Sequence, residues 1–228
     1  MRFLRYLVRV PLLAWHVFVH LPVTLLLMAP PFGQLRLAGG GRLHHRMVRL
    51  WSGGLMRVFG MRVRRVGHPM PGAVMFVANH VSWIDIATLH SQRMMGFVAK
   101  REIAGWPGVG WLASRAATIY HQRGSQESLG GVLHEMLARL RDGRAVGVFP
   151  EGRTRDGREV GPFHARIFLA AVAFAPGESF FGNFVRLLGE PARPVEVVIL
   201  APIQPGDAEG RRRIADIARE RIVAAMAA

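Results

Sequence analysis

The sequence predicts an α/β fold, in which helices and strands alternate along the chain and pack in layers. From residue 61 onward, short apolar runs typical of strands alternate with longer segments of helical periodicity. Polar residues that can carry chemistry directly follow two of these runs, an arrangement that recurs in α/β proteins. Before this region, an arginine-flanked apolar segment predicts an N-terminal helix that associates with a membrane.

Composition limits the classes of partner and chemistry. The 228 residues suit one domain with a short appendage, and that length can bury a proper core. Thirty basic residues face 15 acidic ones, and a net charge of +15 implies an anionic partner: nucleic acid, an anionic membrane surface or a phosphorylated substrate. Because there is no cysteine, disulfides, thiolate catalysis and cysteine-ligated zinc are excluded.

The N-terminal segment has four possible interpretations. Arginines flank both ends of the apolar stretch 10–31, so the orientation signal of a simple membrane span is missing. Pro30 and Pro31 stand where a cleaved signal peptide needs small residues. A spanning helix, a helix lying in one leaflet and a buried soluble helix remain open. We expect residues 1–40 to form a membrane-anchoring helix, followed after the glycines at 39–41 by a catalytic domain over 41–228.

The rest of the chain is assigned by periodicity. Residues 45–59 predict an amphipathic helix whose arginines either are solvated or touch lipid headgroups. Strands are predicted over 61–66, 73–78, 96–99, 117–121, 145–149 and 195–200, and the second of these is expected to be buried. Further helices are predicted over 84–93, 109–113, 125–140, 161–174, 180–188 and 208–226.

The first polar cluster contains His80 and, five residues later, Asp85. A histidine can accept a proton near neutral pH, and a nearby carboxylate can fix its tautomer and stabilise its cationic form. However, Ser82 to Asp85 also resembles a capping box, in which the acid only satisfies a helix N-terminus. Spacing alone leaves both interpretations open. No second histidine follows at the spacing of a zinc-binding helix, so we expect no metal.

The second cluster, Glu151, Gly152 and Arg153, follows the predicted strand 145–149. Guanidinium groups match phosphate oxygens, and a glycine lets the backbone approach them closely. Arg123 follows another predicted strand and would lie at the mouth of the sheet if that strand is parallel to its neighbours. In a chain this basic, a solvated surface is the alternative role for each arginine.

Taken together, these residues resemble the glycerolipid acyltransferases, the 1-acylglycerol-3-phosphate acyltransferase family. Asn79 and His80 with Asp85 resemble the family's NHxxxxD signature, and 149–152 resembles its FPEG block. Between them, 119–123 is similar to a block that ends in arginine, and the run from Lys100 to Gly110 matches the intervening pattern. The blocks come in the family's order, and the resemblance covers about residues 42–173.

The resemblance implies a mixed, mostly parallel sheet flanked by helices. It also implies a membrane-associated enzyme that moves a fatty acyl group from acyl-CoA or acyl-carrier protein to the hydroxyl of a lysophospholipid. The expected acceptor is 1-acylglycerol-3-phosphate, which would give phosphatidic acid, and a lyso-aminolipid such as lyso-ornithine lipid is the alternative. No cofactor, no metal and no nucleic acid are expected. The expected location is the cytoplasmic face of the bacterial inner membrane.

Roles for individual residues follow from the same resemblance. His80 would be the general base that deprotonates the acceptor hydroxyl, and Asp85 would orient it. The expected substrate-binding residues, which hold the phosphate-bearing head of the acceptor or lie beside it, are Asn79, Lys100, Arg123, Glu151, Gly152 and Arg153.

Two departures from the family pattern raise another possibility. The order Gly152-Arg153-Thr154 replaces the usual Gly-Thr-Arg. A valine-proline-valine strand, expected soon after residue 173, is absent, so the chain is shortened there. A catalytically impaired, membrane-bound family member is therefore the rival to an active enzyme. A hydrolase is disfavoured because no glycine-flanked nucleophile elbow surrounds Ser82.

Overall fold

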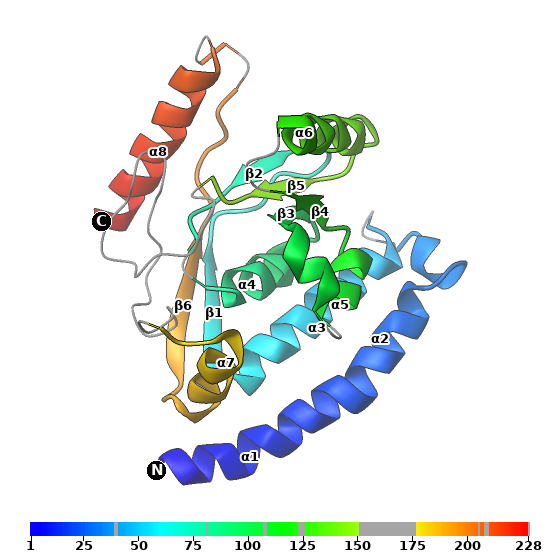
Figure 1. Ribbon diagram of the computed structural model, residues 1–228, viewed down its shortest axis with the longest axis vertical. Helices are drawn as coiled ribbons and strands as arrows, with labels where there is room; N and C mark the ends of the chain where they lie inside the picture. Colours follow the sequence, from blue (N-terminus) through cyan, green and yellow to red (C-terminus); the bar gives the residue numbers. More distant parts are fainter. Residues whose placement is uncertain are drawn as a thin grey trace.

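The structure is a computed structural model that describes residues 1–38, 41–80, 82–106, 109–122, 126–150, 177–204, 206–207 and 210–227. Helices and strands alternate in it, as the sequence predicts (Figure 1). The helices are α1 (Arg2–Trp15), α2 (Leu21–Met28), α3 (Leu43–Val58), α4 (Ile84–Gln92), α5 (Val109–Arg115), α6 (Gln126–Arg141), α7 (Phe180–Gly189) and α8 (Arg211–Ala227). The strands are β1 (Met61–Val66), β2 (Met75–Val77), β3 (Gly96–Lys100), β4 (Ile119–His121), β5 (Val146–Val148) and β6 (Arg193–Val198).

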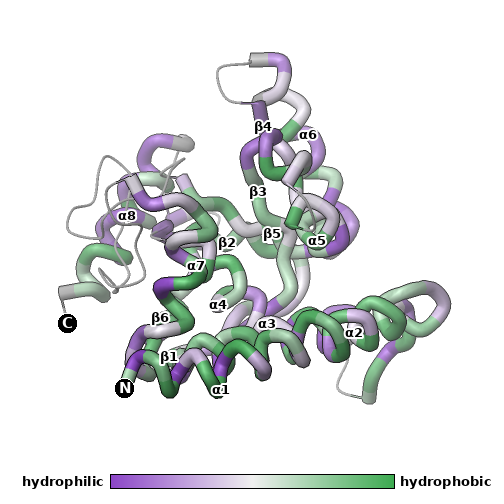
Figure 2. Tube along the Cα trace, turned by 60° about the horizontal axis from the view of Figure 1, so that its bottom comes forward, coloured by the Kyte–Doolittle hydropathy of each residue, from purple (hydrophilic) through white to green (hydrophobic). Residues whose placement is uncertain are grey.

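The N-terminal segment is helical from Arg2 to Met28, and a π-helical turn, His16–His20, joins α1 to α2. Helices accommodate proline by such local adjustments, and Pro11 and Pro22 lie on either side of the turn. By length and composition this helix can cross a membrane, and little of it is buried. Figure 2 shows apolar segments along much of its length.

Two arginines of α1 hold the last turn of α7. Arg5 donates a hydrogen bond to the carbonyl of Gly189, and Arg9 donates to the carbonyls of Leu188 and Glu190. Cations at the C-terminus of a helix satisfy its unpaired carbonyls and interact favourably with its dipole. The sequence suggested that these arginines flank a membrane segment, but the structure gives both of them this internal role.

The main core lies where α3, α4 and α7 meet β1 and β6. Its most deeply buried side chains are Met56, Phe59, Met61, Ile84 and Leu187. Gly60 ends α3 with a positive φ of 73°, a backbone conformation that favours glycine, and the chain turns there into β1. Tyr6 and Leu13 of α1 pack against the edge of this core, so the N-terminal helix is part of the folded domain.

Every strand pairing in the described ranges is parallel, but the strands form two sheets. One contains β1 and β6, and the other has the order β2-β5-β3-β4. Helix α6 packs on one face of the larger sheet through Val132 and Met136, while Ile86 and Leu89 of α4 pack on the other face. Because the strands are parallel, the residues that follow them meet along one edge.

The expectation that the strand predicted over 73–78 is buried is wrong. β2 is the outer strand of the four-stranded sheet rather than a buried one, and Met75 is 48% exposed because β1 and β6 do not pair with it. In α6, Leu133 and Leu137 are exposed although they belong to its apolar stripe. Helical periodicity identifies an apolar face, but neighbouring elements decide how much of it is covered. The predicted helix 161–174 lies outside the described residues. The described stretch 177–192, which follows the place where the family's strand is expected, contains α7 and no strand.

Candidate active site

His80 and Asp85 meet at the carboxyl end of the four-stranded sheet. β2 ends at Val77, and α4 begins at Ile84, so the chain needs only a short turn to bring the two side chains together. Nδ1 of His80 donates a hydrogen bond to Oδ2 of Asp85 at 3.0 Å. This bond assigns Nε2 as the nitrogen with an acceptor lone pair, which a general base requires.

The same carboxylate also caps the helix. Asp85 Oδ2 accepts a second hydrogen bond from the backbone N–H of Ser82 at 2.8 Å, and the Asp85 N–H donates to the carbonyl of Ser82. The hydroxyl of Ser82 is buried and, within the described ranges, has no hydrogen-bond partner. Only the acid half of a capping box is therefore formed, and Asp85 holds both the turn and the histidine.

The imidazole of His80 is stacked on an aromatic ring. The ring of His80 lies 4.1 Å from that of Phe149 at 18°, and Phe149 stacks on Phe97 at 5.1 Å. Phe149 follows β5, the neighbour of β2, and Phe97 lies in β3. The stack restricts the rotation of the imidazole, so its plane is fixed by the sheet as well as by Asp85.

Two of the expected substrate-binding residues lie in the described part of the chain. Asn79 is only 4% exposed, and its side-chain oxygen finds no hydrogen-bond donor among the described residues. Lys100 is exposed at the end of β3. Because β3 lies two strands from β2, Lys100 is roughly 10 Å from the end of β2 along the same edge of the sheet. Arg123, Glu151, Gly152 and Arg153 lie outside the described residues.

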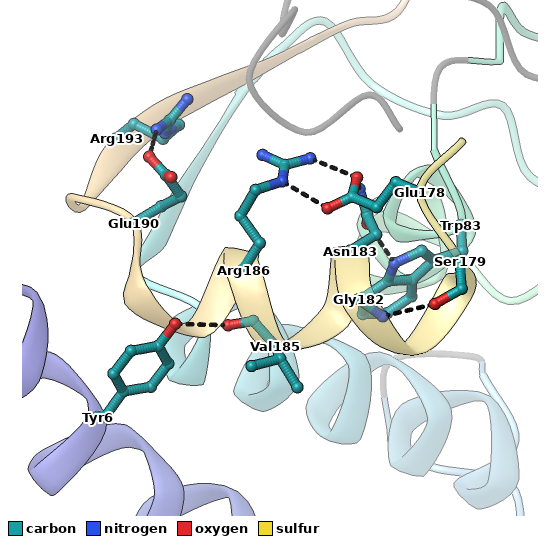
Figure 3. Close-up of polar contacts among 10 residues, drawn as sticks. All are labelled: Tyr6, Trp83, Glu178, Ser179, Gly182, Asn183, Val185, Arg186, Glu190 and Arg193. Atoms are coloured by element: carbon teal, nitrogen blue, oxygen red, sulfur yellow. Dashed lines mark hydrogen bonds and ion pairs between the residues drawn. The ribbon is translucent and has the colours of Figure 1, made fainter. Parts of the chain in front are cut away.

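Sequence reasoning missed the residues that anchor the turn between His80 and Asp85 to α7 (Figure 3). The indole N–H of Trp83 donates to Oδ1 of Asn183 at 3.1 Å, although the two residues are 100 positions apart. Asn183, which is fully buried, donates to Glu178, and both oxygens of that carboxylate also accept bonds from Arg186 at 2.8 and 3.0 Å. A buried polar residue on the apolar helix α7 was the available sequence signal, because such a residue needs partners.

Aromatic packing strengthens this anchor. Trp83 stacks on Phe184 at 5.5 Å and lies edge-on to Phe59, while Phe180 touches both Trp83 and Trp106. Pairs of this kind contribute about 0.5–1.5 kcal/mol beyond the burial of area. The turn between His80 and Asp85 is therefore held by the main core as well as by the sheet.

The geometry can be compared with known proteins. The acyltransferase family model matches residues 62–196, which is more than half of the chain and includes the histidine–aspartate pair. The chain belongs to the acyltransferase family. This membership agrees with the resemblance of its sequence blocks.

Several curated relatives are lipid acyltransferases. The chain is 37% identical over 131 residues to lyso-ornithine lipid O-acyltransferase of Pseudomonas aeruginosa, which covers 57% of this chain and 50% of that protein. It is 33% identical over 127 residues to 1-acyl-sn-glycerol-3-phosphate acyltransferase of Neisseria gonorrhoeae, with coverage of 55% and 50%. The chain spans about half the length of the curated relatives it matches.

A solved structure shares the fold. The 1-acyl-sn-glycerophosphate (LPA) acyltransferase PlsC of Thermotoga maritima superposes with a TM-score of 0.67. The alignment covers all of this chain and 97% of that chain, at 16% sequence identity. This likeness confirms the expected α/β architecture of parallel strands flanked by helices. The apolar helix and the membrane lipids named for the relatives together indicate association with a membrane.

Proposed function

We propose that the protein is an O-acyltransferase that moves a fatty acyl group from an acyl thioester to the free hydroxyl of a lysophospholipid. The observation that carries this proposal is the bond between His80 Nδ1 and Asp85 Oδ2, located where parallel strands end. The proposed acceptor is 1-acylglycerol-3-phosphate, and the product is then phosphatidic acid. Family membership and the names of the relatives support this choice.

In the proposed reaction, Nε2 of His80 removes the proton of the acceptor hydroxyl as its oxygen attacks the thioester carbonyl. A C–O bond forms, the C–S bond breaks, and the departing thiolate takes the proton back from the imidazolium. The carboxylate of Asp85 stabilises the transient positive charge on His80. General-base assistance of this kind is worth about 10²–10⁴ in rate.

Binding roles are proposed for the residues named from the family pattern. Arg123 and Arg153 would contact the phosphate of the acceptor, with Glu151 and Gly152 shaping the same site. Lys100 lies on the same edge of the sheet as His80, which supports a role toward an anionic group. Asn79 is buried beside His80 with an unpaired oxygen in the described structure, which supports a role in holding the reacting hydroxyl.

Lyso-ornithine lipid is the second candidate acceptor. The relative from Pseudomonas aeruginosa and one from Rhodobacter capsulatus, at 37% and 38% identity, carry that name. The acyl donor is proposed to be acyl-CoA or acyl-carrier protein. We place the enzyme at the cytoplasmic face of the bacterial inner membrane, with residues 1–40 as the anchor of a catalytic domain over 41–228.

The test is an assay of the purified full chain with acyl-CoA and acyl-carrier-protein donors against both lysolipids. We expect acylated product from 1-acylglycerol-3-phosphate, and a loss of about 10²–10⁴ in kcat for His80→Ala. If only lyso-ornithine lipid is acylated, it replaces 1-acylglycerol-3-phosphate as the proposed acceptor. Inactivity with every pair would support an impaired family member, and unchanged turnover in His80→Ala would contradict the assignment of the base.

A further inference from the structure

An arginine-lined groove lies apart from the catalytic pair. It has a volume of about 1160 Å³ and runs between α3, β1 and the end of α4. Six arginines line it: Arg42 at the N-cap of α3, Arg46, Arg49 and Arg57 within α3, and Arg62 and Arg64 from β1. None of the described residues that line the groove is acidic.

The arginines form the groove because of their spacing. Positions 46, 49 and 57 fall on one side of a helix with 3.6 residues per turn, whereas Val48 and Leu55 face the core. On β1, Arg62 and Arg64 are two residues apart and therefore share one face of the strand. Two elements thus present their cations to the same space.

These charges are not neutralised inside the described part of the protein. No carboxylate there pairs with any of the six arginines, and Arg42 bonds only the neutral side chain of Gln34. Six cations around one groove repel one another, and an anion between them removes that repulsion. Guanidinium groups match phosphate oxygens in particular.

The groove is distinct from the proposed acyl-transfer site. Ser91 and Gln92, which line it, end α4, whereas Asp85 lies in the first turn of the same helix. From Asp85 to Ser91 the helix rises six residues, which is roughly 9 Å along its axis. A phosphate in the groove therefore lies too far from His80 to belong to the lipid whose hydroxyl reacts there.

Exposed apolar side chains on α3 and on the N-terminal helix that packs against it indicate where the ligand of the groove comes from. α3 packs against the N-terminal helix, with His16 bonded to the Trp51 carbonyl at 3.0 Å and its ring stacked on Trp51. That N-terminal helix exposes Phe3, Leu7, Trp15, Phe18, Val23 and Leu26. Leu50, 52% exposed, lines the groove itself. Arginines beside apolar surface fit an amphiphile whose phosphate is bound while its chains stay in the membrane.

We propose that this groove binds the phosphate headgroup of an anionic membrane phospholipid, in addition to the lipid that is acylated. Bound lipid would hold α3 and β1 at the membrane surface and fix the orientation of the domain. The inference rests on the proposed membrane association but not on catalysis. Binding is therefore its readout, and His80→Ala should bind as the unaltered chain does.

The test is calorimetric titration of the full chain in a neutral detergent with dihexanoylphosphatidylglycerol and dihexanoylphosphatidylcholine. We expect the anionic phosphatidylglycerol to bind and the zwitterionic phosphatidylcholine to give a much weaker signal. Replacing Arg46 and Arg49 with glutamine should weaken binding roughly tenfold or more, since each basic residue near an anionic surface contributes about 1 kcal/mol. Arg62→Gln with Arg64→Gln, on the other wall, should have a similar effect.

The matched control is Arg212→Gln with Arg213→Gln, which removes the same charge from exposed positions of α8 outside the groove. We expect it to change the affinity less than twofold, and an equal loss would overturn the site by showing only a general charge effect. Inorganic phosphate binding as tightly as the lipid would assign the groove to free phosphate. If coenzyme A binds and the groove substitutions weaken its binding, while the lipid does not bind, the groove belongs to the acyl donor. That result also overturns the proposal.

Discussion

At the scale of single residues, Asp85 combines two functions that sequence spacing presented as alternatives. One carboxylate oxygen accepts hydrogen bonds from both the His80 imidazole and the Ser82 backbone. Helix capping and orientation of the histidine are therefore compatible, because the cap brings the acid to the end of the strand. The proximity of the two residues in sequence made this part of the site accessible to prediction.

Asp85→Asn should lower kcat by about 10²–10⁴ while changing the KM of either substrate little. An amide is nearly isosteric, but it does not stabilise the imidazolium and can favour the wrong tautomer. The unfolding free energy should fall by about 1 kcal/mol because a charge-assisted cap is weakened. Steady-state kinetics and thermal unfolding measure the two effects separately. A drop in stability with full activity would leave Asp85 only its capping role.

Because of His45, we expect the free energy of unfolding to decrease in acid. Burial, and then the positive charges around it, lower its pKa from 6.5 to about 4. The unfolded chain therefore binds a proton at this residue between about pH 6.5 and 4 that the folded chain does not. The stability associated with neutral His45 is complete above pH 6.5 and is lost as the pH falls toward 4.

The comparison for His45 is the difference in Tm between His45→Gln and the unaltered chain over pH 7 to 4. We expect the variant to gain relative to the unaltered chain as the pH falls, because it removes one proton-linked penalty. Histidines that do not contact His45 affect both proteins alike and cancel in the difference, whereas His44, whose ring lies 4.2 Å from that of His45, needs the same comparison in a His44→Gln background. A difference that stays constant with pH would contradict the shift.

At the scale of secondary-structure elements, α7 determines how firmly the turn between His80 and Asp85 is held. Trp83 lies between His80 and Asp85, and its indole bonds Asn183, which is tied to the ion pair of Glu178 with Arg186 (Figure 3). Periodicity predicted the helix α7 correctly. Its partner could not be predicted, because a contact across 100 residues depends on the path of the whole chain.

Trp83→Phe should lower kcat several-fold with little change in KM. It keeps the aromatic packing but leaves the buried Asn183 without its donor, which costs about 1–3 kcal/mol of stability and loosens the turn. Trp106→Phe is the matched control, since it makes the same change at a 40% exposed tryptophan that also contacts Phe180. Equal kcat in both variants, despite a lower Tm for the first, would make Trp83 purely structural.

At the scale of the whole molecule, the N-terminal helix belongs to the fold as well as to the proposed anchor. Arg5 and Arg9 cap α7, and Tyr6 and Leu13 pack on the main core. Removing residues 1–31 should therefore lower Tm and the unfolding free energy as well as release the protein from membranes. Uncapped carbonyls and newly exposed apolar surface both contribute.

The double variant Arg5→Gln with Arg9→Gln separates these effects. It should destabilise the chain by about 1–3 kcal/mol, since buried carbonyls lose charged donors, while the apolar surface for a membrane is kept. Arg2→Gln, at an exposed position of the same helix, is the control. Denaturant unfolding and vesicle sedimentation measure the outcomes. Unchanged stability in the truncated chain would contradict the role of this helix in the fold.

The sequence by itself determined the alternation of strands and helices, the pair His80 and Asp85 and the blocks that place the chain in its family. These depend on local periodicity and on turns of a few residues, which short stretches of sequence encode. Only the tertiary structure decided that β2 is an outer strand, that Arg5 and Arg9 cap α7 and that Trp83 bonds Asn183. It also brought the arginines of α3 and β1 to one groove. Such features depend on which distant elements pack together, and that is fixed by the topology of the whole chain.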